Sequence, residues 1–128
     1  MLLVGDRAPA FALDADDGTR VSLRGLKGRT VVLYFYPRDD TPGCTAQACE
    51  FRARWKSVQA TGAALFGVSP DGVPSHRKFR RKLRLPFPLL ADPDHAVAEA
   101  YGVWGEKSMY GRSYQGILRS TFIIGPTG

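Results

Sequence analysis

The chain has 128 residues, of which 44% are hydrophobic, and it carries a formal net charge of +6. A chain of this length buries roughly two thirds of the surface that it exposes when unfolded, so we expect residues 1–128 to form a single domain without a structural disulfide. The sequence contains no apolar run near the ~18 residues of a membrane span, and Asp6 and Arg7 interrupt the apolar start before a signal peptide could form. We therefore expect a soluble protein of the cytoplasm without membrane contact.

The first half of the chain alternates strand and helix patterns. Short extended pieces at 10–13 and 20–23 precede the run TVVLYFY at 30–36, whose β-branched and aromatic residues predict a buried central strand. Apolar residues three or four apart then predict a helix from Thr41 to about position 61, which a glycine ends. A second strand is expected at 64–69.

The second half continues the alternation. We expect a helix from about 73 to 83, a short strand near 89–90, a helix over 94–101, a glycine-rich loop through Tyr114 and a last strand at 120–124. No internal repeat or linker divides the chain. This order of elements predicts an α/β fold in which helices cover both faces of one central sheet.

The positive charge is concentrated in one segment. Six of the 18 basic residues lie in RKFRRKLR at 77–84, and outside it 12 basic residues face 12 acidic ones. Phe79 and Leu83 interrupt the run with helical spacing, which predicts an amphipathic helix with a basic outer face. We interpret this face as solvated and expect no nucleic-acid partner, while a binding site for a polyanion or an acidic protein is the alternative.

Cys44 lies where a buried strand gives way to a helix. Thr41 is a natural N-cap and Pro42 a natural first helical residue, so Cys44 is expected at the third helical position. There its sulfur would lie near unpaired backbone N–H groups and the positive end of the helix dipole, which favour a reactive thiolate. The alternative is an ordinary buried cysteine.

Thiolate formation alone raises the reactivity of Cys44 only to a limited extent. A free thiol is roughly 3% ionised at pH 7, so complete ionisation raises the thiolate concentration only about 30-fold. Rapid attack also needs donors that stabilise the charge on the leaving atom. Thr41 and the N–H groups of Gly43 and Cys44 are local candidates, and an arginine from elsewhere in the chain would add most.

Cys49 is the only other cysteine. On an unbroken helix, residues five apart differ by about 7.5 Å in rise and about 140° in direction, whereas a disulfide needs Cα atoms within ~7 Å. Either the two cysteines are unrelated, or Cys49 attacks an oxidised Cys44 after the start of the helix unwinds. A small buried core residue without chemistry is the alternative interpretation of Cys49.

Other motifs predict no cofactor. His76 and His95 lack zinc-site spacing with the cysteines and stand in polar contexts that predict surface positions. The glycines of 102–116 match no nucleotide-binding pattern, and the absence of CxxC argues against an ordinary dithiol reductase. We expect no metal.

Two longer motifs resemble a known family. PRDDTPGC at 37–44 resembles the active-site pattern of the peroxiredoxins, and YFYPRDDTPGCTAQAC with GVWGEKSMYGRSYQGILRSTFII resembles their bacterioferritin comigratory protein (PrxQ) subfamily, of the atypical two-cysteine kind. The resemblance implies a thioredoxin-like fold with a central mixed sheet flanked by helices. It also implies reduction of hydrogen peroxide and organic hydroperoxides.

The same resemblance assigns roles to five residues. Cys44 would be the peroxidatic cysteine and Cys49 the resolving one, joined in an intramolecular disulfide that thioredoxin or a similar dithiol reduces. Pro37 would shield the site, Thr41 would hydrogen-bond the sulfur or the peroxide, and Arg119 would be the distant cation. A surface arginine is the alternative for Arg119. A protein-disulfide reductase on the same fold and a basic binding module are the rival functions.

Members of this family typically continue past the strand at 120–124 into another strand and a C-terminal helix. This sequence ends at Gly128, so the resemblance implies that both elements are missing. We then expect an unpaired edge at 120–124 and an uncovered apolar face. A monomer is the expected state, with association through the missing elements as the alternative.

Overall fold

The computed structural model describes residues 2–128 and contains a six-stranded mixed sheet with the order β2-β1-β5-β4-β3-β8. The central strands β3 (Val31–Phe35), β4 (Ala64–Ser69) and β5 (Leu89–Ala91) are parallel. Antiparallel strands complete the sheet: β8 (Ser120–Ile124) beside β3, β1 (Ala12–Ala15) beside β5, and β2 (Arg20–Ser22) beside β1. A short 3₁₀ helix, Arg24–Leu26, lies between β2 and β3.

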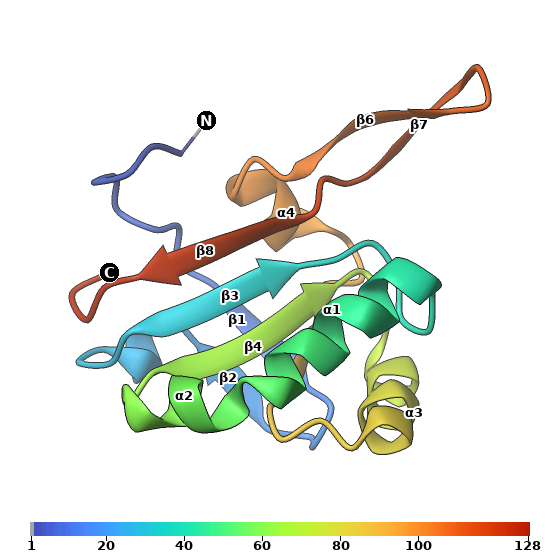
Figure 1. Ribbon diagram of the computed structural model, residues 1–128. Coiled ribbons are helices and arrows are strands. Elements are labelled where there is room, and N and C mark those ends of the chain that lie inside the picture. Colours follow the sequence, from blue (N-terminus) through green and yellow to red (C-terminus); the bar gives the residue numbers. More distant parts are fainter. Residues whose placement is uncertain (1) are drawn as a thin grey trace.

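Helices lie on both faces of this sheet (Figure 1). One face is covered by α1 (Pro42–Ala53), α2 (Trp55–Ala60) and α3 (Val73–Leu83), and the other by α4 (Ala96–Ala100). The predicted α/β fold with a central mixed sheet flanked by helices is therefore confirmed.

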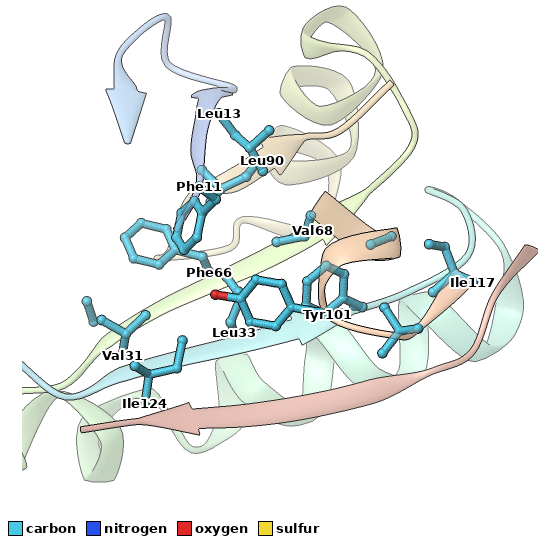
Figure 2. Packing of buried hydrophobic residues seen from close by; sticks show 14 of the residues in the cluster. Phe11, Leu13, Val31, Leu33, Phe66, Val68, Leu90, Tyr101, Ile117 and Ile124 are labelled. Atoms are coloured by element: carbon cyan, nitrogen blue, oxygen red, sulfur yellow. The ribbon is translucent and has the colours of Figure 1, made fainter. Parts of the chain in front are cut away.

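The alternation of side chains along β3 divides the core in two. Leu33 and Phe35 join the cluster on the α4 face, where Tyr101 packs beside Leu33 (Figure 2). Tyr34 and Tyr36 point to the other face, into the cluster that contains the buried Cys44. A strand buried on both faces needs a continuous apolar run, which is why TVVLYFY was a dependable signal.

The helix predicted from Thr41 to position 61 is interrupted. Arg54 has φ −98° and ψ 8°, so α1 ends before it and α2 begins after it. Trp55, the first residue of α2, packs against Phe87 with ring centroids 6.2 Å apart. The apolar spacing continues across the interruption, and so the periodicity did not reveal it.

The glycine-rich segment is not a loop as predicted. It forms a two-stranded hairpin, β6 (Trp104–Met109) and β7 (Arg112–Ile117), which extends away from the main sheet (Figure 1). Tyr110 and Gly111 in its turn have φ values of 52° and 76°, and positive φ at both central residues belongs to the tight turns that suit hairpins. β7 is largely exposed, and neither strand shows the regular apolar alternation that marks a half-buried strand.

The predicted basic helix is confirmed as α3, with Phe79 buried at 2% exposure and the arginines and lysines around it mostly exposed. The edge expected at 120–124 is also observed: in the part of the chain that the structure describes, residues 2–128, β8 pairs with β3 alone, and Ile123 is 76% exposed. Among residues 2–128, no helix has the length and apolar character needed to cross a membrane.

Candidate active site

The segment between β3 and α1 carries the first predicted site residues. Thr41 is the N-cap of α1 with an extended backbone, Pro42 is the first helical residue, and Cys44 is the third, as predicted. The Thr41 hydroxyl does not cap the helix, because it donates instead to the carbonyl oxygen of Arg38 at 3.0 Å. The first amides of a helix have no acceptor within the helix itself, and Cys44 lies in this first turn of α1.

Arg119 meets Cys44 from the far end of the chain. Its Nη2 donates to the Cys44 Sγ over 3.1 Å, and its Nη1 donates to Oε1 of Gln47, one turn further along α1. The contact follows from strand pairing, because Ser120 at the start of β8 lies opposite Phe35 at the end of β3. A guanidinium at this distance attracts negative charge on the sulfur or on an atom bound to it.

Cys44 is almost fully buried, at 2% exposure, although it lies in the first turn of a helix. Tyr34, from β3, belongs to the same apolar cluster and stacks on Phe51 of α1 with centroids 4.6 Å apart. Burial, followed by the charges of Asp39 and Cys44, raises the pKa of Tyr34. Cys44 is therefore packed in an apolar cluster while its sulfur contacts the Arg119 cation.

Cys49 and Pro37 complete the set of predicted residues. Cys49 is partly exposed on the intact part of α1, and it and Cys44 are both free thiols. The structure therefore shows the reduced arrangement, in which the two cysteines lie five positions apart on one helix. Pro37 is partly buried and directly follows Tyr36, at the start of the loop that leads to Thr41.

The sequence prediction for His76 was wrong. We expected a surface position, but the His76 side chain is fully buried and lies 2.7 Å from the Asp39 carboxylate. The helical spacing could have predicted this burial, because His76 precedes Phe79 by three residues and so lies on the same buried face of α3. His95 is partly exposed and stacks face to face on Trp104 with ring centroids 3.7 Å apart.

Asp39, Asp71 and His76 bring their potential ligand atoms within 4.8 Å of one another. Each of these side chains already has hydrogen-bond partners in the protein: His76 for Asp39, Ser69 for Asp71, and Leu90 for His76. The cluster therefore forms a closed polar network beside the β3–α1 loop, distinct from the sulfur site.

Comparison with known proteins agrees with this geometry. Residues 4–128 match the AhpC/TSA family. The peroxiredoxin Bcp of Bacillus subtilis is 48% identical over 125 residues, covering 98% of this chain and 80% of that protein. The peroxiredoxin Bcp of Escherichia coli K12 is 44% identical over 127 residues, covering 99% and 81%.

Solved structures show the same relationship. A structure of Xanthomonas campestris peroxiredoxin Q superposes with a TM-score of 0.87 at 43% identity, covering 92% of this chain and 75% of that one. The peroxiredoxin 6 of Arenicola marina, at 24% identity and a TM-score of 0.86, shares the fold. From its sequence, its mixed sheet and its cysteine at the start of α1, the chain belongs to the AhpC/TSA family, as a peroxiredoxin of the Bcp (PrxQ) type and hence an oxidoreductase with peroxidase activity.

Proposed function

We propose that the protein reduces hydrogen peroxide and organic hydroperoxides through a sulfenic acid on Cys44. The observation that carries this proposal is the 3.1 Å contact between Arg119 Nη2 and the Cys44 sulfur at the start of α1. A structure of the Xanthomonas campestris bacterioferritin comigratory protein, at 42% identity, was described in connection with its alkyl peroxide reduction activity, which supports the organic substrates.

In the first step, the Cys44 thiolate attacks one oxygen of the peroxide and the O–O bond breaks. Cys44 becomes a sulfenic acid, and the leaving oxygen takes a proton and departs as water or an alcohol. Arg119 and the first amides of α1 hold the developing negative charge. Thr41 turns its hydroxyl from Arg38 toward the peroxide or the sulfur, and Pro37 shields the site from water.

In the second step, the Cys49 thiol condenses with the sulfenic acid, forming the 44–49 disulfide and releasing water. The intact α1 separates the two residues too far for this bond, so the first turns of α1 unwind before it forms. The partial exposure of Cys49 is consistent with a thiol that becomes available on unwinding.

In the third step, thioredoxin or a similar dithiol attacks the disulfide and restores both thiols through a mixed disulfide. No metal, flavin, haem or nucleotide takes part in any of the three steps. We propose that residues 1–128 act as one domain and as a monomer in the cytoplasm, where the disulfide is a transient catalytic state.

Single-cysteine variants test the assignment. Cys49→Ser retains Cys44 and its contacts, so we expect it to consume about one equivalent of peroxide and then stop, because no intramolecular thiol reacts with the sulfenic acid. Cys44→Ser should consume none. Peroxide loss and mass spectrometry of the products measure both outcomes. Unchanged turnover of Cys49→Ser with thioredoxin would mean that an external thiol resolves the sulfenic acid.

A further inference from the structure

His76 lies fully buried on α3, and both of its ring nitrogens face oxygen acceptors. Nε2 lies 2.8 Å from the backbone carbonyl oxygen of Leu90 in β5, and Nδ1 lies 2.7 Å from Oδ2 of Asp39. A carbonyl oxygen only accepts hydrogen bonds, so Nε2 must carry a hydrogen. The position of one further proton, between Nδ1 and the carboxylate, decides the charge of the pair.

The surroundings of Asp39 favour the proton on His76. The Tyr36 hydroxyl donates to Oδ1 over 2.6 Å, and the Ser75 hydroxyl donates to Oδ2 over 2.8 Å. Burial and the nearby Asp39 charge raise the pKa of Tyr36 well above its ordinary value, so its hydroxyl remains a donor. Several donors aimed at one carboxyl group favour its ionised form. With a hydrogen on both Nδ1 and Nε2, His76 forms a buried ion pair with the Asp39 carboxylate.

This ion pair holds the loop that precedes α1. Asp39 is fixed through its side chain by His76 and through its backbone amide, which donates to Oδ2 of Asp71 over 2.7 Å. Asp71 is itself held by the Ser69 hydroxyl at the end of β4. Pro37 and Thr41 lie two residues to either side of Asp39, so the network sets the position of both relative to the sheet.

We propose that His76 is a positioning residue for the peroxidase reaction. Its ring, anchored to β5 through Leu90, holds Asp39 and thereby keeps Pro37 and Thr41 in place in the loop that leads to Cys44. The clamp lies before the first turn of α1, so it also keeps the loop attached to the sheet while α1 unwinds and refolds. This inference rests on the proposed function of Cys44, and it adds a residue that touches neither sulfur nor peroxide.

Two substitutions separate the two hydrogen bonds of the ring. The amide nitrogen of asparagine occupies roughly the place of Nδ1, and that of glutamine roughly the place of Nε2. His76→Asn therefore retains a donor to Asp39 and loses the bond to Leu90, whereas His76→Gln does the opposite. If the Asp39 bond positions the site, His76→Gln should slow peroxide attack about tenfold or more, a loss of the size that a misplaced reacting group produces, while His76→Asn stays within about threefold of the parent.

The rate of attack is measured by stopped-flow tryptophan fluorescence after the reduced full chain is mixed with hydrogen peroxide. Amide hydrogen exchange at Asp39 gives a second reading, and we expect lost protection in His76→Gln and retained protection in His76→Asn. The reverse order, with His76→Asn the slower variant, would show that His76 only ties α3 to β5 and would overturn the proposal.

One measurement does not depend on any variant folding. Nitrogen-15 NMR of the parent protein at neutral pH should show hydrogens on both ring nitrogens of His76 and the chemical shifts of an imidazolium. A neutral ring would show that His76 and Asp39 form no ion pair, and it would overturn the proposal. If the parent itself fails to oxidise at Cys44, the proposed function fails, whereas hydrogen exchange and NMR still decide whether His76 holds the loop.

Discussion

Replacement of Arg119 by alanine removes the cation that contacts the Cys44 sulfur. At the observed 3.1 Å between Nη2 and Sγ, two unit charges attract by about 1 kcal/mol in bulk water and by about 5 kcal/mol at the effective dielectric of a protein surface. Arg119 is exposed while Cys44 is buried, so we place the interaction between these limits, at about 2–3 kcal/mol. Only the part of this attraction that is stronger in the transition state than in the resting enzyme lowers the barrier.

We therefore expect Arg119→Ala to lower the second-order rate constant for peroxide attack by about tenfold to a hundredfold, because each 1.36 kcal/mol changes a rate about tenfold. Stopped-flow tryptophan fluorescence of the reduced protein with increasing hydrogen peroxide measures this constant. The unfolding temperature should change little, because the side chain is exposed.

Arg112→Ala is the matched control, because it removes an exposed arginine from the hairpin strand β7. It should react like the parent protein. Arg119→Lys keeps the charge but not the planar guanidinium group that reaches both Cys44 and Gln47. Its rate constant should therefore lie between those of Arg119→Ala and the parent protein. A rate constant for Arg119→Ala within about threefold of the parent would refute the electrostatic reasoning, since it corresponds to less than about 1 kcal/mol.

Two further predictions concern stability. Gly67→Ala should destabilise the fold by about 1–3 kcal/mol in urea unfolding, because the added Cβ would lie 2.7 Å from the Tyr34 ring and 2.9 Å from Leu89 in the packed core. An unchanged urea midpoint would show that the Tyr34 ring moves freely to accept the methyl group. Asp92 accepts the amides of Val97 and Ala98, so Asp92→Ala should cost about 1–2 kcal/mol and Asp92→Asn less. Burial raises the pKa of Asp92, and a carboxyl group with a raised pKa contributes stability that is lost as the pH rises. The stability of Asp92→Asn should therefore increase relative to that of the parent as the pH rises through the acid range. A difference in stability that does not change with pH would contradict this prediction.

The elements that the sequence predicted well are those with strong local signals. The apolar run of β3 and the amphipathic spacing of α3 specify a buried strand and a half-buried helix wherever the chain places them. The hairpin β6–β7 was missed because its strands lack regular apolar alternation and its turn is Tyr-Gly, which lacks the Asn-Gly signature of such turns. His76 was misplaced because its polar neighbours concealed the helical stripe that it shares with Phe79.

The start of the active-site helix can be predicted from local sequence. A strand, a short loop, an N-cap and a proline are neighbours along the chain, so Cys44 reaches the third helical position through local backbone geometry alone. The identity of the cation that contacts the sulfur and of the imidazole that contacts the loop could not be predicted in this way. Arg119 reaches Cys44 across 75 residues through the register of β3 with β8, and His76 reaches Asp39 across 37 residues through the packing of α3. Contacts between distant segments depend on how whole elements pair and pack, which no local pattern of residues encodes.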